Sequence, residues 1–507
     1  MTSAKISGRV VLEQLSLPFV EASSDLVSPG IPKPRRIFVN RDLAMSGAEW
    51  IGFDMDYTLA IYDQPQMDRL SIAATVEKLV ARGYPSFLTE VAYDTRFPIR
   101  GLLIDKRFGN ILKMDRYKVV QRGYHGMRAL TKEEIHSLYQ SKKLRPTTPR
   151  YHWIDTLYAL SEASLYAGIV DAFDTRGLKG DYARIFTDIR ESIDEAHRDG
   201  TILDPVLADL PRYVVRDPEL APTFHKFRSA GRKLFLLTNS RWPYTDRVMA
   251  YLLGGSMPEY PTWRHFFDVV VVAAQKPAFF EQRRPLMERE GAELVPAVFH
   301  HERGKVFEGG NLRDLERLLG VSGDKILYVG DHIYGDILRS KKESSWRTAM
   351  IVQELEAEVS ANETCASDLA HNDELSEARA KLEDELRYYQ ARYKEVCRQI
   401  ETFTAKGVNG TTLAEKVAER GRSKRGVERV RGLLRELERE STHLQTLVDR
   451  QFHPYWGPLL KEAAETSSFG DQVEHYACLY TSRVSNFLGY SPLQYFRSPR
   501  DLMPHEL

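Results

Sequence analysis

The chain has 507 residues, 42% of them hydrophobic and 28% charged, and its 71 Lys and Arg residues balance 71 Asp and Glu residues. This composition is typical of a globular protein with two or more domains. The zero net charge argues against a chain-wide surface for nucleic acid. The three cysteines are widely spaced, which excludes a cysteine-rich metal site and indicates no disulfide framework.

The N-terminus lacks the continuous apolar run of a signal peptide. No window approaches about 18 uninterrupted apolar residues, so no membrane-spanning helix is expected. We therefore expect a cytoplasmic protein whose partners include neither a membrane nor nucleic acid.

The first predicted element follows an N-terminal extension over residues 1–35. It is a short buried strand within 47–55, in the segment EWIGFDMDYTLAIYD, and it ends at Asp54. Asp56 follows two residues later, and two carboxylates so close together repel each other. A cation is therefore expected beside them.

A long helical and irregular stretch is expected next. Further apolar runs follow it, and each has the pattern of a strand that ends in polar residues. These runs lie within 232–240, 267–277, 324–336 and 346–352. Apolar runs of this length, separated by helical segments, predict a parallel sheet covered on both faces. We predict one α/β core from residues 36–65 and 231–355, with an inserted, mainly helical domain over 66–230.

The last part of the chain, residues 356–507, is predicted to be a helical region that packs on the core. Leucines and tyrosines recur at helical spacing among charged residues, which favours two long antiparallel helices lying against the body. The basic piece ERGRSKRGVERVR contains interleaved glutamates, so a solvated helix face is favoured there over nucleic-acid binding. The aromatic tail is expected to pack back on the core.

Polar side chains follow four of the predicted strands, and ligands bind at the carboxyl ends of strands in such sheets. They are Asp54 and Asp56, then Thr238, Asn239 and Ser240, then Lys276, then Asp331 and Asp336. Each signal alone also has an ordinary structural explanation. The D-x-D can arise by chance, Thr-Asn-Ser can cap a helix, Lys-Pro can form a turn, and GDHIYGD can be a glycine-rich loop. Together they place crowded carboxylates, which suit Mg²⁺, beside groups that hold a phosphoryl group. A carboxylate can then be the nucleophile, and a second can protonate the leaving oxygen.

The segments FDMDYT, LLTNS, QKP and VGDHIYGD resemble, in this order, the four motifs of the haloacid dehalogenase (HAD) superfamily of phosphotransferases. Longer segments between residues 35 and 355, among them GFDMDYTLAIY and ILYVGDHIYGDILRSKK, are similar to the cytosolic purine 5′-nucleotidase family that prefers IMP and GMP. This resemblance implies a HAD-like Rossmannoid parallel sheet with an inserted helical cap.

The resemblance also implies a role for each strand-end residue in a Mg²⁺-dependent reaction. Asp54 is the implied nucleophile, which forms an aspartyl-phosphate, and Asp56 is the general acid and base. Thr238, Asn239 and Ser240 hold phosphoryl oxygens, and Lys276 neutralises the nucleophile and the phosphate. The implied metal ligands are Asp54, Asp56, through its carbonyl, and Asp331, with Asp336 as close support.

Purine recognition is implied in the inserted domain. The segment IRESIDEAHRDG resembles the substrate helix of the family and brings Arg190, Asp194 and His197 near the nucleotide. Tyr158 occupies the place of a base-stacking aromatic, although it also suits the core face of a helix. Two positions depart from the family: Leu203 replaces a phosphate-binding lysine, and Ala159 replaces an amide.

The family implies two further partners, a nucleoside acceptor and a purine nucleotide effector bound between subunits of a homodimer or homotetramer. Arg145 and Tyr334 match the effector site, but Asp155 replaces an asparagine there and would repel a triphosphate, so ATP activation is not expected. The leading hypothesis is a nucleotidase that hydrolyses purine nucleoside 5′-monophosphates. The alternatives are a nucleoside phosphotransferase, a phosphatase for another phosphoester and, from a different class, a non-catalytic nucleotide-binding interaction protein.

Overall fold

The centre of the protein is a ten-stranded sheet, seen in a computed structural model that describes residues 30–140, 144–300, 302–338, 344–407, 410–500 and 503–506. Most of the predicted N-terminal extension, residues 1–29, lies outside the described residues. The strands are, in spatial order, β1 (Phe38–Val39), β20 (Leu479–Thr481), β17 (Arg347–Ile351), β16 (Ile326–Gly330), β3 (Trp50–Phe53), β11 (Lys233–Leu237), β12 (Val269–Val272), β15 (Val306–Gly309), β13 (Leu286–Glu290) and β14 (Glu293–Pro296).

The middle of this sheet is parallel, as predicted. Strand β3 lies between β16 and β11 and is parallel to both, and β12 and β17 continue the parallel order on either side. All four residues of β3 are buried, which explains its uninterrupted apolar sequence. Gly52 is required there, because a Cβ at this position would lie 2.0 Å from Cζ of Phe235 on the neighbouring strand. The core helices that follow the later strands are α8 (Trp242–Leu253), α9 (Ala278–Glu281) and α10 (Leu312–Leu319).

The chain leaves the core after β4 (Ile61–Tyr62) and returns through β10 (Val214–Val215), which pairs with β4. The intervening segment is mainly helical, as predicted. Its helices, with the return helix that leads into β11, are α1 (Gln64–Ala81), α2 (Lys132–Ile135), α3 (Leu160–Thr175), α4 (Tyr182–Arg198), α5 (Leu203–Ala208), α6 (Leu210–Tyr213) and α7 (Leu220–Ser229).

The same segment also contains a five-stranded antiparallel sheet that we did not predict. Its strands are, in spatial order, β8 (Arg128–Ala129), β7 (Val120–His125), β6 (Asn110–Met114), β5 (Leu102–Asp105) and β9 (Tyr151–Ile154). Every residue of β5 and β6 is buried. The alternation of apolar and polar residues that marks a half-exposed strand is therefore absent from these two sequences.

Asp68 is buried on α1, where its Oδ1 accepts a hydrogen bond from Gln64 and its Oδ2 finds no partner among the described residues. Burial raises the pKa of Asp68 to about 7, opposed by the Gln64 hydrogen bond. A carboxyl group whose pKa is higher in the folded than in the unfolded state makes stability fall as pH rises between the two values.

We therefore expect Asp68→Asn to have little effect on stability near pH 4 and to stabilise the protein by a few kcal/mol at pH 8, with about 4 kcal/mol as the upper limit. Urea unfolding of both proteins at the two pH values measures this. The exposed control Asp209→Asn should show no such pH-dependent gain. A gain for Asp68→Asn that is equal at both pH values would contradict the burial argument.

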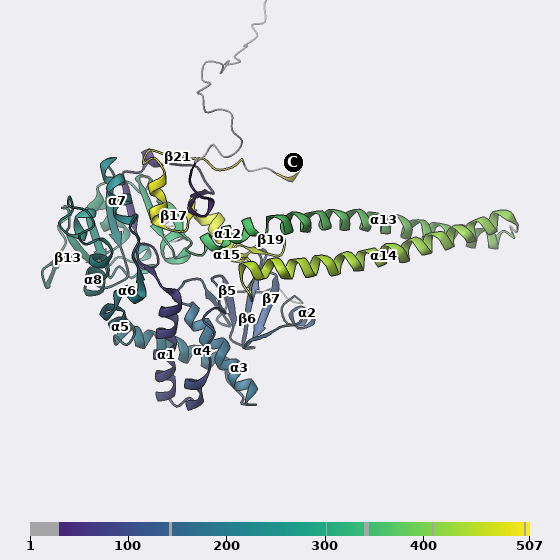
Figure 1. Ribbon diagram of the computed structural model, residues 1–507, viewed down its shortest axis with the longest axis horizontal. Coiled ribbons are helices and arrows are strands. Elements are labelled where there is room, and N and C mark those ends of the chain that lie inside the picture. Colours follow the sequence, from purple (N-terminus) through teal and green to yellow (C-terminus); the bar gives the residue numbers. More distant parts are fainter. Residues whose placement is uncertain are drawn as a thin grey trace, which may run out of the picture.

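The two long helices differ from our prediction. Helices α13 (Ala366–Ala405) and α14 (Thr411–Phe452) lie side by side and antiparallel, but they project far beyond the body instead of packing along it (Figure 1). Their sequences explain this, because both are rich in charged residues and few of their positions are buried. The buried positions are Leu375, Val396, Ser423, Gly426, Val430, Val448 and Asp449.

The segment after α14 returns to the body and contacts both the inserted segment and the core. The indole of Trp456 is buried and donates to the Phe97 carbonyl at 2.6 Å. Lys113, from β6, forms a buried ion pair with Glu462 at 2.8 Å. Further on, β20 pairs with β17 in the main sheet. The tail therefore ties the inserted segment to the core.

Candidate active site

The carboxyl ends of the central strands bring three buried carboxylates together. Oxygen atoms of Asp54, Asp331 and Asp336 lie within 4.8 Å of one another. Nζ of Lys276 lies 2.8 Å from Oδ1 of Asp54 and 2.6 Å from Oδ1 of Asp336. The side chain of Lys276 is only 3% exposed. This ammonium group is the cation that the close pair of carboxylates after β3 led us to expect.

The electrostatics of this cluster favour a further cation. Burial, followed by the nearby carboxylates, raises the pKa of Asp54 well above its usual value, although Lys276 opposes this. Burial and then Asp336 raise the pKa of Asp331 to about 7. Burial lowers the pKa of Lys276, but Asp336 and Asp54 outweigh this and raise it overall, so the ammonium stays charged. One lysine faces three carboxylates among the described residues, so the fully ionised cluster would carry excess negative charge, and a further cation would favour this ionised form.

Asp56 is held by hydroxyl groups on both of its oxygens. Tyr62 donates to Oδ1 and Ser240 donates to Oδ2, each at 2.6 Å. The hydroxyl of Tyr62 also lies 2.9 Å from that of Tyr244 on α8. Burial raises the pKa of Asp56, while the hydrogen bonds from Ser240 and Tyr62 oppose the rise. These contacts fix the orientation of the Asp56 carboxyl group.

The segment after β11 is connected to the loop that carries Lys276. Asn239 accepts a hydrogen bond from the Lys276 backbone N–H at 2.6 Å and donates to its carbonyl at 3.0 Å. Thr238 is fully buried, and its hydroxyl accepts from the Ser240 N–H at 3.1 Å. The predicted residues of this segment therefore lie at the cluster, but the side chain of Asn239 is engaged in positioning Lys276.

Four residues that support the cluster were missed by our sequence reasoning. Tyr62 and Tyr244 hold Asp56, and Tyr328 accepts a hydrogen bond from Lys276 at 3.0 Å. Arg100 is buried and donates to the Asp331 carbonyl at 3.0 Å and to Glu354 at 2.8 Å. The three tyrosines lie inside or beside the motif segments, where a phenol next to a strand end is a usable signal; Arg100 has no such signal.

The predicted substrate residues of the inserted segment divide into two groups. The ring of Tyr158 lies edge-on to that of Tyr57, 4.7 Å between centroids, and 5.8 Å from that of His197. These side chains reach the loop that carries Asp56. Arg190 instead forms a 2.5 Å ion pair with Glu162, and Asp194 is exposed on α4.

The positions that depart from the family have structural surroundings of their own. Leu203 packs against the main hydrophobic core, and Ala159 is buried just before α3. Asp155 lies 3.7 Å from His332, across the junction between the inserted segment and the core. Arg145 is exposed, and the side chain of Tyr334 is outside the described part of the chain.

Comparison with known proteins identifies relatives over most of the chain. The model of the 5′ nucleotidase family matches residues 37–507. A 5′-nucleotidase domain-containing protein of Dictyostelium discoideum is 28% identical over 482 residues, which cover 93% of this chain and 75% of that protein. The 5′-nucleotidase domain-containing protein 2 of Rattus norvegicus is 31% identical and that of Homo sapiens 30%. Each of these alignments covers 66% of this chain, with 63% of the rat and 67% of the human protein.

Solved structures with partial similarity include CbbY from Rhodobacter sphaeroides in complex with phosphate, 14% identical with a TM-score of 0.23 over 60% of this chain and 86% of that chain. The HAD-hydrolase YfnB from Bacillus subtilis bound to magnesium is 13% identical, with a TM-score of 0.20. The match covers 60% of this chain and 88% of that chain. These scores are low, so the assignment rests on the family match together with the motifs and the sheet.

The parallel sheet, the inserted helical cap and the carboxylates at the strand ends define the class of this protein, a phosphohydrolase of the HAD type. Within that class, the match over residues 37–507 shows that the chain belongs to the 5′ nucleotidase family. Among the described residues, no helix has the length and apolar character needed to cross a membrane.

Proposed function

We propose that the protein is a Mg²⁺-dependent 5′-nucleotidase that hydrolyses purine nucleoside 5′-monophosphates, with IMP and GMP as preferred substrates. The observation that carries this proposal is the buried group of Asp54, Lys276 and Asp336, next to an Asp56 held by two hydroxyl donors. This arrangement supplies a nucleophile, a fixed positive charge and a separate acid.

Asp54 attacks the phosphorus atom in the proposed reaction. Lys276 and the Met55 N–H both contact Oδ1 of Asp54, each at 2.8 Å, which leaves Oδ2 to form the bond. The ammonium of Lys276 stabilises the ionised form of Asp54 against its burial, and it also offsets the charge of the incoming phosphate. The product of this step is an aspartyl-phosphate.

Asp56 carries the proton in both steps. Its protonated carboxyl group donates to the 5′-oxygen as the P–O bond breaks, which releases the nucleoside. The resulting carboxylate then takes a proton from the water that attacks phosphorus, and phosphate and free Asp54 are regenerated. The raised pKa of Asp56 favours the protonated starting form. Tyr62 and Ser240 keep the carboxyl group in place throughout.

The donor set of the cluster fits Mg²⁺. Asp54, Asp331 and Asp336 offer carboxylate oxygens only, and hard oxygen ligands that leave room for water and phosphate are those that Mg²⁺ takes in proteins. Asp54, Asp331 and the Asp56 carbonyl would hold the ion, with Asp336 in support. Bound there, the ion neutralises charge on the phosphoryl oxygens. Arg100 donates to the Asp331 carbonyl at 3.0 Å and so restrains the backbone of this proposed ligand.

Binding of a nucleoside is supported by the aromatic groups of the inserted segment. Tyr158 and His197 lie next to the catalytic loop, and stacking of a base on such a ring is worth roughly 1–3 kcal/mol. Arg190 and Asp194 lie on α4, the helix that also carries His197. We propose these four residues as the nucleoside contacts.

The test is phosphate release from a panel of purine and pyrimidine nucleoside monophosphates and p-nitrophenyl phosphate, with Mg²⁺ and with EDTA. Hydrolysis of IMP and GMP that EDTA abolishes supports the proposal. Hydrolysis of p-nitrophenyl phosphate alone would keep the chemistry and refute the nucleotide assignment. Release from no substrate would refute both.

A further inference from the structure

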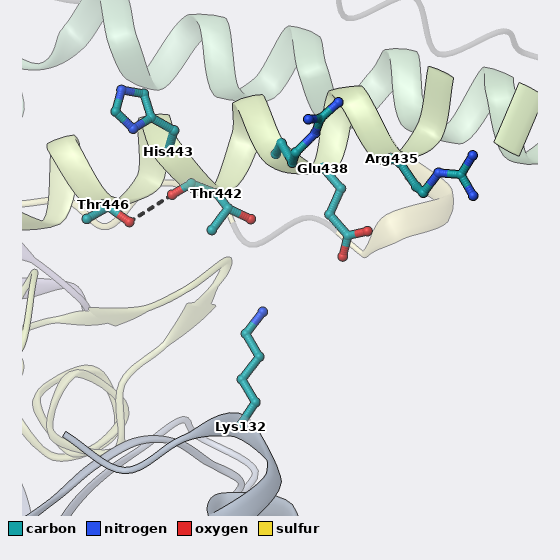
Figure 2. A pocket seen from close by; sticks show the side chains of 7 residues that line it. Lys132, Arg435, Glu438, Thr442, His443 and Thr446 are labelled. Atoms are coloured by element: carbon teal, nitrogen blue, oxygen red, sulfur yellow. Dashed lines mark hydrogen bonds between the residues drawn. The ribbon is translucent and has the colours of Figure 1, made fainter. Parts of the chain in front are cut away.

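The hairpin of α13 and α14 is an arm with little support from the body. The helices have 40 and 42 residues, which at 1.5 Å per residue makes each about 60 Å long. They lie against each other and leave the body near α12 (Leu355–Thr364). A groove of about 850 Å³ separates α14 from α2, with Lys132 and Glu438 pointing into it from opposite sides (Figure 2). Few positions of the arm are buried, so most of its surface is open to solvent.

Charge is divided along this arm. Its half near the body, 366–385 and 433–452, is acidic, and its outer half, 386–407 and 410–432, is basic. The acidic residues of the near half are Asp368, Asp373, Glu374, Glu377, Glu383, Asp384, Glu385, Glu436, Glu438, Glu440 and Asp449, against five Lys and Arg residues. The basic residues of the outer half are Arg387, Arg392, Lys394, Arg398, Lys406, Lys416, Arg420, Arg422, Lys424, Arg425, Arg429 and Arg431, against five Glu residues.

The face of α13 that is turned away from α14 repeats this division in a narrow stripe. Leu375 and Val396 are buried, which marks the face toward α14, whereas Tyr388 is 64% exposed. Beside Tyr388, on the outward face, one heptad position carries Glu377, Asp384, Ala391 and Arg398 in order. This heptad position is thus acidic at Glu377 and Asp384, before Tyr388, small at Ala391 and basic at Arg398.

When two such stripes lie side by side in opposite directions, the acidic part of each faces the basic part of the other. We propose that the outward face of α13 pairs with the same face of a second copy of this chain, antiparallel, about a two-fold axis close to Tyr388. The arrangement brings Glu377 of one copy near Arg398 of the other, twice. A two-fold contact uses the same patch on both subunits, as this one does. The exposed tyrosines at the axis supply the desolvated aromatic centre that dominates many interfaces.

A second copy fits the arm better than a polyanion does. A nucleic acid would contact the basic half alone and would be repelled by the acidic half, which is of similar length. A second arm in the reverse direction satisfies both halves at once. Opposite charges that face each other along an interface also set the register and exclude parallel pairing.

The test is the mass of the full chain in solution by sedimentation equilibrium at micromolar concentration, compared with 58.2 kDa for one chain. The wild type is expected as a dimer, or as a larger assembly built from such dimers. Tyr388→Ala, Glu377→Arg and Arg398→Glu should each weaken this contact at least tenfold and halve the mass. The double variant Glu377→Arg/Arg398→Glu should restore the wild-type mass, and an equimolar mixture of the two single variants should form a heterodimer.

A matched control is Arg439→Glu, a reversal of charge on α14 beside the groove, which should keep the wild-type mass. Far-UV circular dichroism shows that each variant retains its helices. A monomeric wild type overturns the proposal, and binding of that monomer to heparin would assign the basic half to a polyanion instead. A wild-type assembly that is unchanged by either single reversal overturns it equally.

Discussion

Replacing Asp54 by asparagine is expected to lower the rate of phosphate release by at least about 10³-fold, as removal of a catalytic nucleophile does. An amide has the shape of the carboxylate, but its oxygen is neutral and is too weak a nucleophile to attack phosphorus. The fold should be unaffected or slightly stabilised, because burial and the neighbouring carboxylates disfavour the charge of Asp54. Lys276 keeps its 2.6 Å contact with Asp336.

The measurement is the initial rate with IMP and Mg²⁺, with thermal unfolding of the same sample as the folding control. Asp209→Asn makes the same chemical change at an exposed position and should leave the rate unchanged. If the Asp54→Asn protein retains a tenth of the wild-type rate, Asp54 is not the nucleophile. Asp56 would then be the next residue to test.

Replacing Lys276 by methionine is expected to have the largest effect on stability. The change removes the only lysine that the described structure places in the cluster and leaves Asp54 and Asp336 buried without their partner. Breaking a buried ion pair in this way typically costs about 3–5 kcal/mol. Activity should fall as well, since the ammonium group then no longer offsets the charge of Asp54 against the phosphate.

Chemical unfolding in EDTA and in millimolar Mg²⁺ distinguishes the causes. Mg²⁺ should stabilise the Lys276→Met protein more than the wild type, because a dication replaces part of the lost charge. Lys325→Met is the matched control. Lys325 is 42% exposed and pairs with Glu49 at 3.7 Å, so its loss should change stability by less than about 1 kcal/mol. Equal stability of wild type and Lys276→Met in EDTA would refute the structural role of the ion pair.

The cluster of carboxylates and Lys276 was accessible to sequence reasoning because each of its members stands within a few residues of a strand end. Asp54, Lys276 and Asp331 stand a few residues after apolar runs that could only be buried strands. Once the sheet was expected to be parallel, their convergence followed, since all the strands end at one edge.

The supporting contacts were less accessible, because they join residues that are distant in sequence. Arg100 lies 231 residues from the Asp331 carbonyl that it contacts. The pairing of Arg190 with Glu162 depends on how α3 and α4 are packed, which periodicity does not specify. The sheet of the inserted segment was missed for a related reason, since β5 and β6 are buried on both faces and show no alternation.

Local patterns were thus sufficient to locate the core strands in the chain, the polar residues that follow them and the two long helices, because strand and helix periodicities and the residues that end them are properties of neighbouring residues. Tertiary structure alone showed that Asp56 is held between Tyr62 and Ser240, that the tail ties the inserted segment to the core, and that α13 and α14 project. A helix sequence specifies which of its faces is apolar. Whether a charged face meets the body or solvent depends on what the rest of the chain brings to it, because packing is decided by contacts between segments far apart in sequence.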